Sequence, residues 1–319
     1  MASLRSMILD GRTAPVPLRE DGKKYAARFE LTQKALRSRD TILVNTNSVE
    51  RDLFNADGTT DDRSYLDRRL IPRPKPPYPV MWLESVKANE WMGSLVTRMD
   101  IVNEDHLKAF VKASPISYDR DQLEAIGKLA RPTIVEVVSW AAGKGYVEPV
   151  GDFVYWLNAE GDWQDSRYWH FGPLSDSFHG IADIQKDEFK WIRTNYQLIA
   201  ACEYSVLHTF ARMNCHNVKL VPITAGAPKP KKSSHPPFSS PWHEIVVTSL
   251  PQLRREQKGE VAPDGEKREL RFHRVRGHYA DYTKGKGLFG NPNLRKQFWI
   301  EEHKSGDPEQ GTVVSSYTV

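Results

Sequence analysis

The spacing of apolar residues separates a helix- and strand-bearing N-terminal part from a C-terminal part that contains only short strands. Between residues 20 and 40, apolar side chains recur at helical spacing among lysines and arginines, which predicts a basic amphipathic helix. A shorter helix is predicted over residues 104–112. From Lys186 to Met213 the helical spacing persists for about eight turns, which predicts one long core helix.

Runs of alternating or β-branched residues predict the strands of the N-terminal part. We expect these strands at residues 41–44, 80–86, 134–140, 153–157 and 218–221. The second of them follows residues 71–79, where five prolines in nine residues enforce an extended path. That proline-rich segment is either a stiff lead-in to the strand or a ligand for an aromatic groove. Residues 163–180 mix aromatic and polar side chains, and we expect a loop that is pinned to the core or stacks a base or sugar.

Composition marks the expected domain borders. Residues 1–19 contain two prolines and are expected to form an extended arm. Residues 224–241 hold five prolines, three lysines and no acidic residue, a composition typical of a linker or mobile loop. We therefore expect a mixed α/β domain over residues 20–223 and a β-rich module over residues 242–319.

The C-terminal module is expected to contain short strands separated by Gly, Pro and Asn in tight turns. These strands are predicted at residues 242–250, 267–275, 279–282, 297–301 and 312–319. Their spacing predicts a small antiparallel β module, either barrel-like or a bent sheet. Together with the N-terminal domain and its long helix, this gives the fold class α+β.

Charge and cysteine content narrow the function classes. The 319 residues include 45 basic and 41 acidic side chains, so the formal net charge is only +4 and any nucleic-acid binding requires a local patch. Two cysteines, Cys202 and Cys215, are too few for a disulfide framework and lack a metal-binding spacing, which favours a cytoplasmic location. No run of 18 apolar residues exists and the N-terminal apolar run is short, so we expect neither a membrane span nor a signal peptide. No cofactor is indicated.

Candidate chemistry concentrates in the predicted strand at residues 267–276 and in the segment that follows it. Alternation along this strand puts Arg274 and Arg276 on one face and His273 on the other. A strand that changes from apolar to cationic midway normally leaves the core for a groove or rim. Gly277 permits a bend at that point.

Anion binding is the first chemical interpretation of this segment. Arginines present forked donors to phosphate, backbone N–H groups of the glycines at 285, 287 and 290 approach an anion, and aromatic rings stack on bases. The residues that we assign to this role are Arg274, Arg276, His278, Tyr279, Tyr282, Phe289, Trp299 and His303. The partner would be nucleic acid.

Catalysis is the second interpretation, with His273 and His278 as base and acid in a metal-free phosphodiester cleavage and Arg276 stabilising the charged transition state. A third, weaker one is a metal site of His273, His278 and His303, which lacks an acidic ligand, and we assign no metal. A purely structural interpretation competes with all three: the arginines pair with neighbouring carboxylates and the histidines bond to the backbone. The segment would then stabilise the fold.

The same residues carry a resemblance to known sequences. The segment His273–Tyr282, followed by Leu288–Gly290, Phe298–Ile300 and His303, resembles the C-terminal pattern H-x-V-R-G-H-[FY]-x-x-Y, L-F-G and [FY]-W of uncharacterised bacteriophage and prophage proteins. The resemblance implies a phage or prophage origin, and so the host-cell cytoplasm, without implying an activity. Three functions stay open: nucleic-acid binding, a non-enzymatic interaction with a host or phage protein, and a toxin-like ribonuclease.

Overall fold

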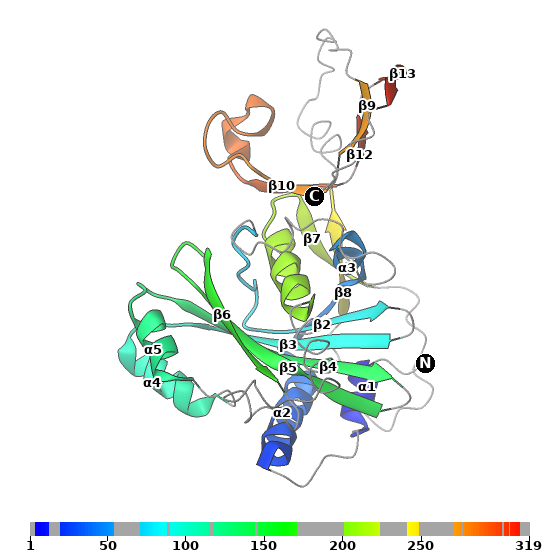
Figure 1. Cartoon of the computed structure of the whole chain (residues 1–319). Helices are drawn as coiled ribbons and strands as arrows, with labels where there is room; N and C mark the ends of the chain where they lie inside the picture. Colours follow the sequence, from blue (N-terminus) through cyan, green and yellow to red (C-terminus); the bar gives the residue numbers. More distant parts are fainter. Residues whose placement is uncertain are drawn as a thin grey trace, which may run out of the picture. The chain divides into compact units, whose positions relative to one another are not determined.

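The chain divides into two compact units in the computed structural model (Figure 1). The first contains Met1–Ala211 and Val221–Ile245, and the second contains Arg212–Leu220 and Val246–Val319. The residues that the structure describes are 4–12, 20–53, 71–87, 90–114, 118–143, 146–170, 201–223, 241–248, 271–275, 277–301, 303–305 and 307–312.

An eight-stranded mixed sheet has the strand order β6-β5-β4-β3-β2-β1-β8-β7. Most of this sheet lies in the first unit, whereas residues 218–220 and 246–247 of its last two strands group with the second. Its strands are β1 (Ile42–Asn45), β2 (Val80–Lys87), β3 (Glu90–Asp100), β4 (Thr133–Gly143), β5 (Tyr146–Leu157), β6 (Trp163–His170), β7 (Val218–Pro222) and β8 (Trp242–Val247). From β2 to β6 neighbouring strands are antiparallel, whereas β1 runs parallel to both β2 and β8. All five strands predicted for the N-terminal part are confirmed, with small displacements of their ends except in β5, which begins at Tyr146 and not at the predicted residue 153.

Three strands of this sheet depart from the sequence prediction, and one of them, β3, lies at residues 90–100, where no strand was predicted. Residues 163–170, expected in a loop, form the edge strand β6, while residues 171–180 lie outside the described residues. Strand β6 pairs antiparallel with β5, with Trp163 opposite Leu157 and His170 opposite Gly151. The local composition of residues 163–170 does not reveal this pairing partner. Residues 242–247, expected as the first strand of the C-terminal module, form β8, which pairs with β1. Trp242–Ile245 accordingly group with the first unit, and the module does not begin at residue 242.

The described α-helices include three that the sequence predicted and three that it did not, namely those over residues 4–9, 47–53 and 120–127. They are α1 (Leu4–Leu9), α2 (Glu20–Arg37), α3 (Asn47–Leu53), α4 (Glu104–Ala113), α5 (Arg120–Gly127) and a helix over residues 201–213. The predictions of α2, of α4 and of the C-terminal half of the long helix are confirmed, whereas residues 186–200 lie outside the described part. No helix in the described ranges is long and apolar enough to cross a membrane.

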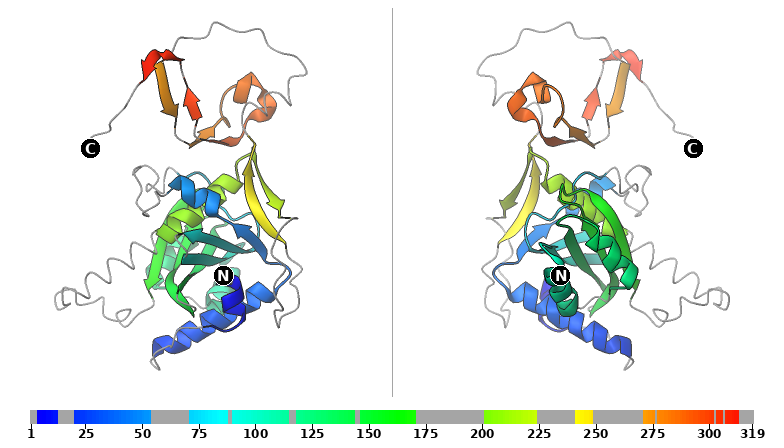
Figure 2. Two further views of the ribbon diagram at one scale, coloured as in Figure 1. Left: turned by 90° about the vertical axis from the view of Figure 1, so that its right-hand side faces the viewer. Right: turned by 90° about the vertical axis from the view of Figure 1, so that its left-hand side faces the viewer.

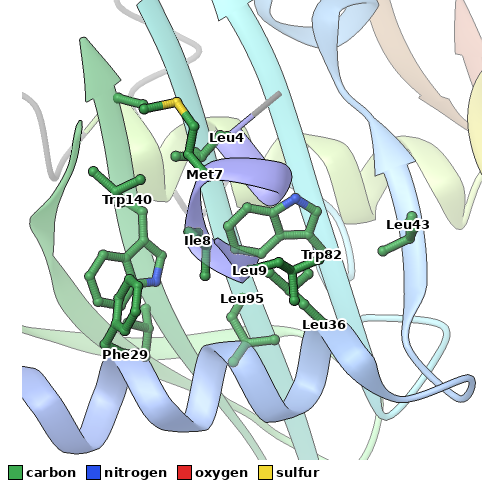
Figure 3. Packing of buried hydrophobic residues seen from close by; sticks show 13 residues of the cluster. Leu4, Met7, Ile8, Leu9, Phe29, Leu36, Leu43, Trp82, Leu95 and Trp140 are labelled. Carbon is green, nitrogen blue, oxygen red and sulfur yellow. The ribbon is translucent and has the colours of Figure 1, made fainter. Parts of the chain in front are cut away.

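Helix α1 corrects the expectation of an extended arm over residues 1–19. Its side chains Leu4, Met7, Ile8 and Leu9 are buried. They join a core cluster of side chains from α2 and the sheet, which Figure 3 shows around Trp82. The two prolines that suggested an arm stand after the helix, at residues 15 and 17, and so cannot prevent it.

Helices cover both faces of this sheet, as Figure 2 shows from two sides. On one face Phe29 of α2 packs edge-on against Trp140 of β4, with ring centroids 5.5 Å apart. The preceding residue of β4, Ser139, hydrogen-bonds to Cys202 of the helix over residues 201–213. Because successive side chains of a strand point to opposite faces, this helix lies on the other face.

The proline-rich segment 71–79 is built into the first unit as a lead-in to β2. The Tyr155 hydroxyl donates a hydrogen bond to the Pro74 carbonyl at 2.9 Å, and Arg98 Nη1 donates one to the Pro76 carbonyl at 2.6 Å. These bonds satisfy carbonyl groups that a polyproline path leaves open.

The described strands of the second unit are β9 (Arg271–Val275), β10 (His278–Asp281), β11 (Gln297–Ile300), β12 (His303–Ser305) and β13 (Asp307–Thr312). Strands β10 and β11 form an antiparallel pair, whereas β9 pairs with β12 antiparallel and with β13 parallel. The module was expected to be antiparallel and either barrel-like or a bent sheet. The described strands instead form a two-stranded and a three-stranded sheet without closing a barrel, and one pair, β9 with β13, is parallel. The broader class α+β is confirmed.

Candidate nucleic-acid interface

The loop that joins β10 to β11 carries positive charge and no acidic residue. Residues 282–300 contain Lys284, Lys286, Arg295 and Lys296 and neither Asp nor Glu. All four cationic side chains are exposed. None of them forms an ion pair with another of the described residues. An anion can therefore approach these groups without displacing a carboxylate.

A small apolar core of its own holds this loop in shape. Leu288, Leu294 and Phe298 are buried against one another, and Tyr282 packs on them. The Tyr282 ring meets the Phe298 ring edge-on, with centroids 5.9 Å apart. The Tyr282 N–H donates a hydrogen bond to the Lys296 carbonyl at 3.0 Å, which closes the loop at its base. The four cations are thus displayed on a packed scaffold.

Two short 3-10 turns, Leu288–Gly290 and Pro292–Leu294, shape the far end of the loop. Gly287 precedes them with a φ of 81°, and a Cβ there would collide with the Asn291 carbonyl oxygen. The Gly290 N–H, one of those expected to face an anion, instead donates to the Gly287 carbonyl at 3.1 Å. This turn leaves Phe289 exposed at its surface.

Trp299 lies beneath this region as a buried packing residue. Only 2% of its surface is exposed, so it offers no ring face to a ligand in the role that the sequence suggested. The Arg212 guanidinium stands over the Trp299 ring at 4.0 Å from the centroid, within the range of a cation–π interaction. Half-buried Tyr279 packs edge-on against Trp299 with centroids 4.8 Å apart.

Hydrogen bonds from Asn217 and His216 connect the segment 212–220 to β11. The Asn217 side chain donates to the carbonyls of Thr248 and Trp299 at 3.0 and 2.7 Å. Its Oδ1 accepts the Trp299 N–H at 2.9 Å. The adjacent His216 N–H donates to the Gln297 carbonyl at 2.8 Å. These bonds fix the strand on which the basic loop ends.

Gly277 serves close packing. A Cβ at this position would lie 2.7 Å from Cζ2 and 3.2 Å from Cη2 of Trp299. The glycine therefore admits the indole ring beneath β10, a contact that a side chain of any size would obstruct.

Positive charge extends from the loop onto the neighbouring segment. Desolvation, followed by the nearby Lys296 and Lys219 ammonium groups, lowers the pKa of His216 below its ordinary value. Lys219 and His216 are both exposed. Because both ammonium groups act on the same imidazole, Lys219 and Lys296 contribute to one positive region.

The remaining motif residues are placed only in part. His278 is exposed on β10, and Tyr282 is half-buried at the base of the loop. The backbone of β9 pairs with β12 so that His303 stands opposite Val275, but the side chains of His273, Arg274 and His303 and all of Arg276 lie outside the described residues. Among the side chains that are described, no three His, Cys, Asp or Glu groups gather as a metal site would require.

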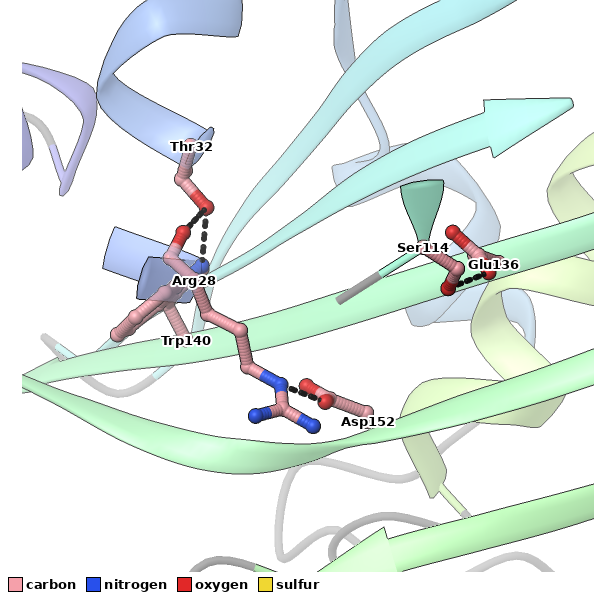
Figure 4. Close-up of polar contacts among 6 residues, drawn as sticks. All are labelled: Arg28, Thr32, Ser114, Glu136, Trp140 and Asp152. Atoms are coloured by element: carbon pink, nitrogen blue, oxygen red, sulfur yellow. Dashed lines mark hydrogen bonds and ion pairs between the residues drawn. The ribbon is translucent and has the colours of Figure 1, made fainter. Parts of the chain in front are cut away.

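Buried carboxyl groups of the first unit form a second polar cluster, seen in Figure 4. Arg28 Nε donates to Asp152 Oδ2, and Glu136 Oε1 accepts hydrogen bonds from Ser114 and from Tyr118, the latter at 2.6 Å. Burial raises the pKa of Asp152 to about 7 and also raises that of Glu136. Arg28, Asp152 and Glu136 are each less than 7% exposed, so this cluster serves packing and not a substrate.

A third buried carboxyl, Glu84, belongs to the α1 face of the sheet. Its Oε2 accepts hydrogen bonds from Trp82 Nε1 at 2.7 Å and from the Arg5 backbone N–H at 3.2 Å. Burial raises the pKa of Glu84 to about 7 despite these bonds.

Neither cysteine is suited to nucleophilic chemistry. Cys202 and Cys215 are both buried, and desolvation raises the pKa of each thiol to about 12. Since the thiolate is the reactive form, both are packing residues.

Comparison with protein-family models, with curated proteins and with solved structures finds no match to this chain. Sequence reasoning singled out the arginines and histidines of the motif but not Lys284, Lys286, Arg295 and Lys296. Their signal was present as a 19-residue stretch, 282–300, that contains four cations and no acid.

Proposed function

We propose that this chain binds an anionic partner, nucleic acid, through the basic loop over residues 282–296 together with Lys219. The observation that carries the proposal is the set of four exposed cations on a packed loop without any carboxylate. Lysine and arginine contacts to phosphates are independent of base sequence, so we expect binding with little sequence specificity.

The motif around Gly277 and Trp299 supports this proposal indirectly. Trp299, Arg212 and Asn217 make the packing and hydrogen bonds that hold β10 and β11, the strands from which the loop projects. The fold-stabilising and anion-binding interpretations are therefore compatible. Trp299, Arg212 and Asn217 would stabilise the strands, and the cations of the loop would contact the ligand. On the sequence motif alone, we also propose a phage or prophage origin.

A non-enzymatic interaction with a host or phage protein is the second candidate function. The burial of Trp299 favours this candidate, because a motif whose residues stabilise the fold does not by itself indicate catalysis or ligand binding. The same exposed cations would then meet an acidic protein surface. Ribonuclease activity is the third candidate, with exposed His278 as its accessible imidazole.

The test is binding of a fluorescent 20-nucleotide RNA and its DNA equivalent by anisotropy, using the full chain. We expect the double variant Lys284→Glu/Lys286→Glu to lose at least about tenfold in affinity, because two attractive contacts become repulsive. The variant Lys112→Glu/Lys128→Glu applies the same charge change at exposed positions of the first unit and should bind as the wild type does.

Three outcomes would redirect the interpretation. Absence of any salt-sensitive binding by the wild-type chain would contradict the proposal. Equal losses in the loop variant and the control would mean that net charge alone attracts the polymer. Cleavage of the RNA that disappears in folded His278→Ala protein would favour the ribonuclease candidate.

A further inference from the structure

Phe289 occupies an exposed position at the far end of the basic loop. Its side chain is 45% exposed, although its neighbour Leu288 is buried in the core of the loop. Within six residues on either side stand Lys284, Lys286 and Arg295, all exposed. One large aromatic ring is therefore displayed among cations.

The backbone at Phe289 makes this display unusual. Phe289 has a φ of 56°, in the left-handed region, and Gly290 follows it with a φ of 73°. A bulky residue rarely adopts this conformation, which glycine or asparagine adopts at lower cost. Strained positions of this kind are held by the surrounding structure and cluster at ligand-binding sites.

We propose that Phe289 is a stacking platform for an unpaired base, so that the loop prefers single-stranded nucleic acid to duplex. This inference rests on the proposed function and specifies its ligand class. An exposed ring stacks on the face of any base, and the flanking cations contact the adjoining phosphates. In a duplex the base faces are covered by their neighbours, so an aromatic side chain finds only base edges and the backbone.

The ligand can be single-stranded RNA or single-stranded DNA, because both offer base faces and phosphates. The proposed contacts are made to base faces and phosphates, which RNA and DNA share, so we expect the two to bind within about threefold of each other. A larger preference for RNA would assign a further contact elsewhere without removing the stacking role.

The experiment compares the full-length wild type with Phe289→Leu, Phe289→Trp and Phe289→Gly on matched 20-nucleotide single strands and the corresponding duplex. Phe289→Leu keeps an apolar side chain and loses the ring. We expect it to weaken single-strand binding about tenfold and to leave duplex binding unchanged. Phe289→Trp should bind single strands at least as tightly as the wild type.

Thermal unfolding distinguishes loss of stacking from loss of fold. Because glycine tolerates the left-handed conformation, Phe289→Gly should unfold at the wild-type temperature or higher while losing single-strand preference. A wild type that binds duplex as tightly as single strands, with Phe289→Leu unchanged, would overturn the stacking role and leave anion binding intact. Absence of binding to either form would instead remove the proposed function itself.

Discussion

Trp299 and Gly277 both contribute to one packing contact in the motif. The indole is buried between the Arg212 guanidinium and the edge of Tyr279, and the missing side chain at Gly277 leaves space for it. The sequence suggested base stacking for Trp299 and a bend in the strand for Gly277. Burial, which depends on distant segments such as residues 212–217, could not be read from the local pattern.

Gly277→Ala should destabilise the second unit by about 1–3 kcal/mol, because the added methyl group overlaps the Trp299 ring. In a Trp299→Phe background the smaller ring leaves room, and the same substitution should cost less. A double-mutant cycle of chemical unfolding measures the coupling, expected at about 0.5–3 kcal/mol. Additive effects of the two substitutions would show that the contact does not govern this position.

Glu84 gives a pH dependence whose direction follows from its burial. Its pKa in the folded protein is raised from 4.5 to about 7, so the folded state binds the proton more tightly than the unfolded chain does. The resulting stabilisation is fully present below pH 4.5 and is lost as the pH rises through 7. Its full size is about 3 kcal/mol.

Glu84→Gln keeps the hydrogen-bond acceptor and removes the titration. We expect this variant to be more stable than the wild type at pH 8 and to show a flatter stability profile between pH 5 and pH 8. Urea unfolding across that range provides the measurement, with exposed Glu160→Gln as the matched control. Superimposable profiles for Glu84→Gln and wild type would show that Glu84 ionises without cost.

Elements with strong local signals were predictable, and those defined by distant partners were not. Helix α4 combines helical spacing with an N-cap residue, Asn103, whose side chain accepts a hydrogen bond from the His106 N–H at 2.8 Å. Neighbouring residues therefore determine where this helix begins. Strands β6 and β8 instead exist because they extend a sheet whose other strands lie far away in sequence. The same holds for α1, whose short apolar run becomes a helix by packing on the sheet.

Ile8→Ala tests whether α1 is part of the core. Ile8 is fully buried, so the substitution should destabilise the first unit by about 2–5 kcal/mol. Lys34→Ala, on the exposed side of α2, should change stability by less than about 0.5 kcal/mol. Thermal or urea unfolding compares the two variants. Unchanged stability of Ile8→Ala would show that residues 4–9 do not contribute to the core.

On the scale of the whole molecule, the net charge is small, but positive charge is concentrated in one loop. The net charge of +4 is small, and buried carboxyls and an ion pair account for much of the polar chemistry of the first unit. The loop over residues 282–296 differs because its cations are exposed and lack ion pairs with described residues. Composition predicts that any binding of nucleic acid must depend on a local patch, and the structure shows that the four cations of residues 282–296 are exposed on one packed loop.

The dependence of binding on salt tests the central claim most directly. Each cation that neutralises a phosphate of a single strand contributes roughly 0.7 to the slope of log K against log salt concentration. We expect Lys284→Ala/Lys286→Ala to reduce that slope by about 1.4 relative to the wild type, while Lys112→Ala/Lys128→Ala leaves it unchanged. A wild-type slope that the loop variant retains in full would contradict the assignment of these residues as the binding surface.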